Sequence, residues 1–194
     1  MIDGEKQRLR DRMRKLAAGP TPAEKSHSVE VLCRLALWDR SSSILLYTPI
    51  AGEPDPLPLM QMPGNRSFLF PKITGDRLEV YRHSAGSLWT VGPFGIREPD
   101  PESWEAASPA EVDLALVPGL AFDPKGGRLG RGKGFYDRLL GDPGFRGIKI
   151  GFAWEWQIIG EVPGMAHDIR MDFVLAGEKI YDPGSRLDKP EERG

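Results

Sequence analysis

The sequence predicts an α/β fold, a single-domain three-layer sandwich with a mainly parallel central sheet flanked by helices. Amphipathic helical stretches and short apolar runs alternate along the chain, which is the order that a parallel sheet with crossover helices requires. At 194 residues and 40% hydrophobic content, the chain suffices for one core and is too short for two independent ones. We therefore expect one domain over 1–182 and a polar tail over 183–194.

The first helix is expected over residues 3–18. Its apolar side chains recur at about 100° per residue and share one face. They are Ile2, Leu9, Met13 and Leu16. Lys6 and Arg10 lie along one edge of that face, four residues apart. The basic residues on the other side are Arg8, Arg12 and Lys15. From the pattern alone, all of these charges favour a solvated helix face.

A second helix is expected to begin after Thr21 and to run to about Trp38. Thr21 is a candidate N-cap, and Pro22 occupies the first helical position, where its missing N–H costs nothing. Cys33, the only cysteine of the chain, falls on the apolar side of this helix. A single cysteine excludes an intramolecular disulfide, and its apolar setting favours a core position over a nucleophile.

Short apolar runs predict the strands of the sheet. They lie at 43–47, 67–71, 77–82, 112–118, 147–153 and 171–176. Serines and a Thr-Pro pair bound the first run, which is typical of a buried strand followed by a loop. That loop places Glu53 and Asp55 beyond the end of the strand. Residues 84–109, rich in Gly, Pro and Trp, predict a long structured excursion that is either functional or surface decoration.

Composition excludes several classes of protein. The formal net charge of −2 provides no overall basic field for gathering nucleic acid, so any anion site has to be local. No apolar run approaches the roughly 20 residues that span a bilayer, and none near the start resembles a signal peptide. We therefore expect a cytoplasmic, monomeric protein in a reducing compartment, which acts without a membrane or nucleic acid.

One stretch, GGRLGRGKGFYDRLL at 126–140, carries five glycines and several basic side chains. It lies between a buried strand and an amphipathic helix, where α/β sheets bind ligands. Glycines let backbone N–H groups approach an anion, and the start of the helix adds positive dipole. Arg128, Arg131 and Lys133 add mobile charge. The pattern therefore predicts a phosphate site.

The spacing Gly127-x-x-x-x-Gly132-Lys133 matches a Walker A loop up to its last position. There Gly134 replaces the Ser or Thr that would hold a metal, so the metal ligand is expected elsewhere, and Asp137 is the nearest carboxylate. The loop also does not fit the dinucleotide fingerprint. A flexible connection and an RNA-contacting segment of the RGG kind are the alternatives.

The loop and the strand before it resemble the 5-formyltetrahydrofolate cyclo-ligase family, also called methenyltetrahydrofolate synthetases. The family pattern is a hydrophobic strand ending in Pro-Gly, a Phe-Asp, and then Gly-x-Arg-Leu-Gly-x-Gly-Lys-Gly-Tyr-Tyr-Asp. Here it stands as LVPGLAFDPKGGRLGRGKGFYD. Weaker matches follow the same order: Lys6 and Arg10 as KxxxR, Glu53, PKI-G at 71–75, GPFGIREP at 92–99, Gln157 followed by VP, and HD-x-x-x-D at 167–172. Phe135 replaces the usual first Tyr, and Ala176 stands where a Thr often ends the last strand.

The resemblance implies an enzyme that converts 5-formyltetrahydrofolate and ATP to 5,10-methenyltetrahydrofolate, ADP and phosphate. ATP would be the co-substrate, Mg²⁺ the metal, and the folate, with or without a polyglutamate tail, the small-molecule partner. In the implied mechanism the formyl oxygen attacks the γ-phosphate, N10 attacks the activated carbon, and phosphate leaves as the ring closes. Catalysis would then consist mainly of positioning and of neutralising phosphate charge.

The resemblance also assigns roles to residues. Lys133 and Arg131 are the expected catalytic residues, with Lys133 stabilising charge on the transferring phosphoryl group. Asp137 and Asp168 are the expected Mg²⁺ ligands, since Mg²⁺ prefers a few carboxylates together with phosphate oxygens. The expected ATP-binding residues are Lys6, Arg10, Arg128, Leu129, Gly130, Arg131, Gly132, Lys133, Gly134, Phe135 and Tyr136. The expected folate-binding residues are Glu53, Arg131, Gly132, Lys133, Gly134 and Phe135. Thr48, or Tyr47 next to it, is expected to line the same pocket because it lies near Glu53.

Some residues and functions keep two interpretations. Trp89, Trp104 and Tyr81 either stack on the folate or, as their pattern alone favours, pack in the core or in loops. His167 either orients Asp168 or is structural. A different ATP-dependent kinase or ligase is an alternative function, as is an RNA-binding protein that reuses the fold through its RGRGKG loop. The net acidity of the chain argues against the RNA-binding alternative.

Overall fold

The computed structural model describes residues 2–16, 22–165 and 168–185. The helices are α1 (Ile2–Leu16), α2 (Pro22–Cys33), α3 (Ala36–Arg40) and α4 (Phe135–Leu140). The strands are β1 (Ser43–Leu45), β2 (Ser67–Thr74), β3 (Arg77–Arg82), β4 (Trp89–Val91), β5 (Arg97–Pro99), β6 (Glu105–Ala107), β7 (Leu114–Val117), β8 (Ala121–Phe122), β9 (Arg128–Leu129), β10 (Ile148–Ala153), β11 (Phe173–Ala176) and β12 (Lys179–Tyr181).

Within the described residues, eight strands form one sheet in the order β12-β11-β10-β7-β1-β2-β3-β6. The central strands from β11 to β2 run parallel, and β1 meets β7 through the pairs Ile44 with Leu114 and Leu45 with Ala115. The edges are antiparallel, with β12 on one side and β3 and β6 on the other. The predicted α/β fold with a mainly parallel sheet is confirmed.

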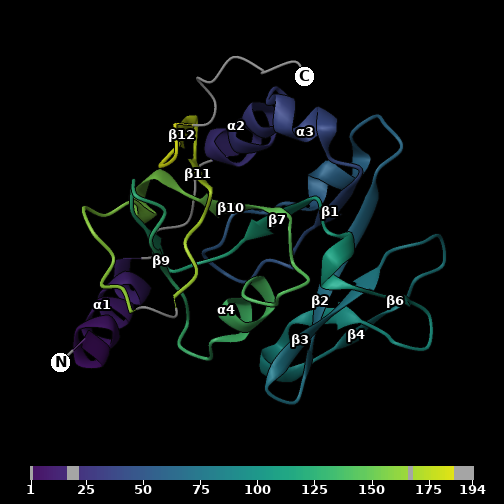
Figure 1. Ribbon diagram of the computed structural model, residues 1–194, viewed down its shortest axis with the longest axis horizontal. Helices are drawn as coiled ribbons and strands as arrows, with labels where there is room; N and C mark the ends of the chain where they lie inside the picture. Colours follow the sequence, from purple (N-terminus) through teal and green to yellow (C-terminus); the bar gives the residue numbers. More distant parts are fainter. Residues whose placement is uncertain (1, 17–21, 166–167, 186–194) are drawn as a thin grey trace.

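Helices cover both faces of this sheet, as a three-layer sandwich requires (Figure 1). On one face, α2 and α3 contribute Leu32 and Trp38 to a buried cluster that contains Phe152 of β10. On the other face, α4 packs Leu139 into a second cluster beside Val117 of β7. Burial of each such large apolar side chain stabilises the fold by about 1.5–3 kcal/mol, so these two clusters hold the layers together.

The helix α1 packs outside the sheet, next to the hairpin β8–β9 (Figure 1). A small third cluster joins them, in which Met13, 2% exposed, meets Leu129 and Val162. Ile2 and Leu16, predicted on the same apolar face, are 40% and 50% exposed. The third cluster reaches only the middle of α1, so both ends of its apolar face remain in solvent.

The second helix is shorter than predicted. α2 ends at Cys33 and α3 begins at Ala36, so the single helix expected to reach Trp38 is wrong. Leu35 between them has an extended backbone, with φ −79° and ψ 137°. This break brings Trp38 into the core, where it is 3% exposed. Cys33 packs against the core as expected, whereas Thr21 lies outside the described residues.

The excursion over 84–109 is structured. β4 and β5 pair as an antiparallel hairpin, and β6 joins the sheet beside β3. Trp89 and Trp104 pack edge-on against Phe70, with ring centroids 5.0 and 5.6 Å away. Tyr81 belongs to the same buried cluster. The packing interpretation of these three aromatic residues is therefore the one the structure supports.

No helix in the described ranges is long and apolar enough to cross a membrane. Residues 186–194 of the expected tail lie outside the described residues. The domain boundary at residue 182 and the expected monomer stay predictions.

Candidate functional site

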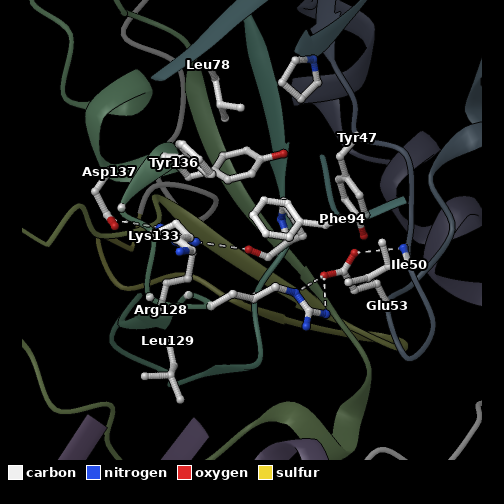
Figure 2. Close-up of a pocket in the computed structure, with 18 of the residues that line it drawn as sticks. Tyr47, Ile50, Glu53, Leu78, Phe94, Arg128, Leu129, Lys133, Tyr136 and Asp137 are labelled. Carbon is white, nitrogen blue, oxygen red and sulfur yellow. Dashed lines mark hydrogen bonds and ion pairs between the residues drawn. The ribbon is translucent and has the colours of Figure 1, made fainter. Parts of the chain in front are cut away.

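A cavity of about 550 Å³ opens at the carboxyl ends of β1 and β7, two neighbouring parallel strands. The loop after β1 contributes Thr48 and Glu53, and the loop after β7 contributes Pro118 and Gly119. Residues of α1, of the β2–β3 and β4–β5 hairpins and of 128–137 form most of the remaining wall (Figure 2), and Met165 and Asp168 complete it. This is the edge at which α/β sheets bind ligands, and the volume suits a small-molecule site.

The glycine-rich loop reaches this cavity by way of a hairpin. β8 and β9 pair Ala121 with Leu129 and Phe122 with Arg128 before α4 begins. Gly132 (φ 100°) then has a left-handed backbone that other residues disfavour. In a P-loop, by contrast, the glycine-rich segment joins strand and helix directly. The hairpin therefore separates this loop from the P-loop class, as the missing Ser or Thr indicated.

The helix that follows the loop is only six residues long. It ends at Leu140, and the backbone N–H of the C-cap residue Gly141 donates to the backbone carbonyls of Asp137 and Leu139. A helix macrodipole is the sum of aligned peptide dipoles. Because this helix has few peptide units, it adds little to anion binding. Charge for an anion therefore has to come from side chains and loop N–H groups.

A buried aspartate holds the β8–β9 hairpin in place. Asp123 is 2% exposed, and its carboxylate accepts three backbone hydrogen bonds. The donors are the N–H groups of Lys125, Gly127 and Val162, at 2.8, 2.9 and 2.8 Å. Gln157, also 2% exposed, donates to the carbonyl of Gly119 at 2.7 Å. The sequence motifs contain both residues, but only the structure reveals that they position the loop.

Two basic residues of α1 face the cavity. Lys6 is 6% exposed, and its Nζ lies 2.5 Å from Oδ2 of Asp168. Arg10 donates from Nε to the carbonyl of Gly130 at 3.0 Å. The solvated-face interpretation is therefore wrong for Lys6 and Arg10, because this edge of α1 lies against the glycine-rich loop. The basic residues that are exposed as expected are Arg8, Arg12 and Lys15.

Arg128 is a buried cation in the wall, with a side chain 5% exposed. Its Nη2 donates to Oδ1 of Asp137 at 2.9 Å, and its Nη1 donates to the carbonyl of Pro118 at 3.3 Å. The guanidinium lies 5.6 Å from the ring centroid of Tyr136. Within the described residues, its buried Nε has no hydrogen-bond partner. A desolvated cation with one N–H group that lacks an acceptor suits an anionic ligand.

Glu53 and Arg131 pair across the cavity mouth (Figure 2). Oε1 of Glu53 accepts from Nε and Nη2 of Arg131 at 3.2 and 2.9 Å, and Ile50 N–H donates to Oε2 at 3.2 Å. Burial raises the pKa of Glu53, and the charge of Arg131 opposes that rise. Burial also raises the pKa of Tyr47 and of Tyr136, so both phenols stay neutral at physiological pH.

Lys133 is exposed at the cavity wall. In the described part of the chain, its ammonium group has no hydrogen bond or ion pair, while its carbonyl accepts from Arg138 Nη2 at 3.0 Å. Its backbone is therefore anchored and its charge is available. This combination suits a lysine whose ammonium group contacts an anionic ligand in the cavity.

One side of the cavity is apolar and was not predicted from the sequence. Its residues come from the β2–β3 hairpin and the β4–β5 hairpin, and they are Pro71, Ile73, Leu78, Phe94 and Ile96. The signals that could have indicated them are the PKI-G and GPFGIREP motifs, which contain four of the five. Most of the cations in the lining come from α1 and the glycine-rich loop, while Arg97 and Glu98 of β5 add charged groups beside the apolar residues.

Every residue that received a role from the sequence lines this one cavity. They are Lys6, Arg10, Thr48, Glu53, Arg128, Leu129, Gly130, Arg131, Gly132, Lys133, Gly134, Phe135, Tyr136, Asp137 and Asp168. Leu129 is 1% exposed and packs in the third cluster, so it would contribute through its backbone. Trp89, Trp104 and Tyr81 do not line the cavity, and His167 lies outside the described residues.

The chemistry of the donor set fits Mg²⁺ bound together with phosphate. Among the described residues, no group of three or more His, Cys, Asp or Glu could hold a metal ion by itself. Two carboxylates, Asp137 and Asp168, line the cavity, and each bonds to a cation. Mg²⁺ is commonly bound by one or two carboxylates plus substrate phosphates and water, so two suffice.

The fold and the site define a class of protein. It is an α/β protein whose N-terminal helix and glycine-rich loop gather cations around a cavity at the carboxyl edge of the sheet, opposite a buried acid. The model of the 5-formyltetrahydrofolate cyclo-ligase family matches residues 3–177. The chain belongs to this family.

Individual relatives agree with the family match. A 5-formyltetrahydrofolate cyclo-ligase of Mycolicibacterium smegmatis is 32% identical over 145 residues, 71% of this chain and 74% of the relative. That of Haemophilus influenzae is 28% identical and covers 89% of this chain and 98% of its own. The solved structure of the 5,10-methenyltetrahydrofolate synthetase of Aquifex aeolicus is 32% identical, with a TM-score of 0.80 over 97% of both chains.

Proposed function

We propose that this chain converts 5-formyltetrahydrofolate to 5,10-methenyltetrahydrofolate with ATP and Mg²⁺, releasing ADP and phosphate. The observation that carries the proposal is one cavity in which loop and helix cations face a buried acid and an apolar wall, in a chain of the cyclo-ligase family. A triphosphate requires the cations, and a folate requires both the acid and the apolar wall.

The chemical difficulty is that a formyl group on nitrogen is a poor electrophile with a poor leaving group. Attack of the formyl oxygen on the γ-phosphorus forms a C–O–P linkage and releases ADP. N10 then attacks the activated carbon and loses its proton, the C–O bond breaks, and phosphate leaves. The atoms balance, and the protein has mainly to position the reactants and neutralise charge.

The cavity residues divide between these tasks. Lys133 and Arg131 act on the transferring phosphoryl group, since both belong to the loop and reach the cavity mouth. The remaining phosphates bind at Lys6, Arg10, Arg128 and the N–H groups of 129–136. Thr48 and Glu53 contact the folate, with the Glu53 carboxylate suited to the amino and N–H donors of a pterin edge.

Asp137 and Asp168 would hold Mg²⁺, which supplies neutralisation of phosphate charge when bound. Both carboxylates pair with cations that also line the cavity, Arg128 at 2.9 Å and Lys6 at 2.5 Å. Mg²⁺ with a triphosphate offers a partner of opposite charge to each member of these pairs. The pairs therefore position both the phosphate ligands and the metal ligands.

The deciding experiment measures methenyltetrahydrofolate absorbance from 5-formyltetrahydrofolate, with Mg-ATP present or withheld. We expect product only when Mg-ATP is present. Absence of ATP-dependent product would contradict the proposed function. Salt-sensitive RNA binding without turnover would instead favour the RNA-binding alternative.

The metal role has its own test. Asp137→Asn removes a carboxylate charge and should raise the Mg²⁺ concentration for half-maximal rate by roughly 10-fold or more. The control is Asp142→Asn, just beyond α4, which changes an exposed aspartate that does not line the cavity. An unchanged Mg²⁺ dependence in Asp137→Asn would contradict its assignment as a ligand.

A further inference from the structure

We propose that Phe94, at the tip of the β4–β5 hairpin, binds the flat pteridine ring of the folate against the apolar wall. This inference rests on the proposed function and adds a residue to which no role had been assigned. Three features of the hairpin carry it: the exposure of the ring, the backbone of Phe94, and the close packing of the turn.

The Phe94 side chain is 69% exposed and lines the cavity (Figure 2). The other large hydrophobic side chains exposed in the described residues are Ile2, Leu16, Leu88 and Val91, none of which lines it. An exposed aromatic ring on a cavity wall is apolar surface that a flat ligand can cover. Phe94 is thus the large exposed apolar group placed where a substrate would contact it.

The backbone of Phe94 is unusual for its residue type, with φ 67° and ψ 13°. It is the third residue of a tight turn, closed by a hydrogen bond from Gly95 N–H to the carbonyl of Gly92 at 3.3 Å. Gly or Asn is favoured where φ is positive in such a turn. Non-glycine residues in this region are characteristic of functional sites, because the fold has to hold them there.

The turn that carries Phe94 packs closely against a buried acid of β5. Gly92 N–H donates to the carbonyl of Ile96 at 2.8 Å. The carboxyl group of Glu98, 2% exposed, packs against Gly92 so closely that a Cβ at that position would lie 2.1 Å from Oε2. This packing holds the turn that presents Phe94 to the cavity. A preformed ring surface binds a ligand with less loss of conformational entropy.

The composition of the cavity favours the pteridine over the adenine of ATP as the ring that Phe94 contacts. Phe94 joins Ile73, Leu78 and Ile96 in the apolar part of the lining, whereas most of the cations, which suit a triphosphate, come from α1 and the glycine-rich loop. The β4–β5 hairpin adds one cation, Arg97, whose guanidinium lies 5.0 Å from the ring centroid of Trp89. Figure 2 also shows Phe94 facing the part of the cavity that holds Glu53, the acid suited to a pterin edge. A reduced pteridine keeps a flat pyrimidinone half, which can pack on a benzene ring by offset or edge contacts.

The test uses the full chain with Phe94→Ala, Phe94→Tyr and, as the matched control, Val91→Ala. Val91 lies on the same hairpin and is 73% exposed, but it does not line the cavity. Calorimetry measures Kd for 5-formyltetrahydrofolate and, separately, for a non-hydrolysable ATP analogue. We expect Phe94→Ala to raise the folate Kd about 10-fold and the ATP-analogue Kd less than about 2-fold. Phe94→Tyr keeps a ring and should bind folate like the wild type, as should Val91→Ala.

The outcomes separate this inference from the proposed function. If the wild type binds and converts 5-formyltetrahydrofolate while Phe94→Ala binds it as tightly as Val91→Ala does, the assignment of Phe94 is overturned and the function stands. Weaker binding of the ATP analogue alone would assign the ring to adenine and would also overturn it. A wild type that binds no 5-formyltetrahydrofolate overturns both. Equal melting temperatures of the three variants exclude misfolding as the cause of a raised Kd.

Discussion

Four cationic side chains at this site, Lys6, Arg10, Arg128 and Arg131, are each held by an acid or a carbonyl. Lys6 bonds to Asp168, Arg128 to Asp137 and Arg131 to Glu53. Partly desolvated ion pairs of this kind need good geometry and further hydrogen bonds to offset desolvation. The three acids therefore orient the three cations, and their positions do not depend on long flexible side chains finding a ligand unaided.

Lys133 differs from these cations, because no described acid pairs with its ammonium group. We expect Lys133→Ala to lower kcat about 100-fold, as loss of one charge-stabilising donor at a reacting centre typically does. The melting temperature should stay the same, since an exposed lysine buries little surface. Steady-state kinetics and thermal unfolding measure the two effects.

The matched control for that variant is Lys125→Ala, which removes an exposed lysine at the start of the same loop that does not line the cavity. Its kcat should equal that of the wild type. Equal rates in Lys133→Ala and Lys125→Ala would remove the catalytic role from Lys133.

At the scale of elements, two hairpins supply most of the site. The β8–β9 hairpin carries the glycine-rich loop and is held by the three N–H bonds to Asp123. The β4–β5 hairpin carries Phe94, and its own Glu98 is buried, with Oε2 3.8 Å from Nζ of Lys72 on β2. Both hairpins are too short to be stable alone and depend on contacts with the rest of the protein.

Asp123→Ala should destabilise the protein by about 3 kcal/mol, because three backbone N–H groups lose their buried acceptor. Urea denaturation measures this loss. Asp142→Ala removes one hydrogen bond at an exposed site, to Gly144 N–H, and should cost less than about 1 kcal/mol. Equal losses in the two variants would contradict the structural role of Asp123.

Glu98 makes the stability of the protein depend on pH. Burial raises its pKa above 4.5, and Lys72, 3.8 Å away, only partly opposes that rise. Between 4.5 and the raised value, the folded state binds more protons than the unfolded state, so the free energy of unfolding falls as pH rises. The glutamine side chain of Glu98→Gln is neutral at every pH, so it contributes no such decrease in the free energy of unfolding.

We therefore expect the stability of Glu98→Gln relative to wild type to increase as the pH is raised from about 4 to about 7. Urea denaturation midpoints of the two proteins, measured across this pH range, give the difference in stability. The control is Glu105→Gln, which replaces a glutamate whose side chain is 78% exposed and tests the effect of the same substitution at the surface. A difference for Glu98→Gln that does not vary with pH would contradict the raised pKa.

At the scale of the whole molecule, the position of α1 links the fold to ligand binding. This helix contacts the rest of the protein through the small third cluster and through Lys6 and Arg10, both of which face the cavity. Its attachment to the body of the protein and the binding of phosphates therefore share the same side chains. Ligand binding at the cavity should stabilise this attachment.

Hydrogen exchange tests that coupling. At an Mg-ATP concentration about 10 times Kd, we expect amide exchange in α1 to slow roughly 10-fold, because the ligand binds only the docked form. Exchange in α2, which packs on the opposite face of the sheet from α4, should change less. Equal slowing of α1 and α2 would mean that the ligand stabilises the fold globally and does not act through α1.

Much of this arrangement could be predicted from the local sequence. The apolar runs indicated the central parallel strands, and the spacing of Gly127, Gly132 and Lys133 indicated an anion loop outside the P-loop class. The family motifs indicated every residue assigned to ATP, folate or metal except Thr48, which was expected from its place near Glu53. The edge strands β6 and β12 were missed because three residues are too few for a periodic pattern.

The sequence by itself determined the first helix, the central strands and the loop that carries the cations, because period and residue type are local properties. Only the tertiary structure decided that the second helix breaks before Trp38 and that Lys6 is buried against Asp168. It also decided that Phe94 belongs to the cavity. The physical reason is that periodicity specifies the apolar face of a segment, whereas what covers that face depends on elements far away in the chain.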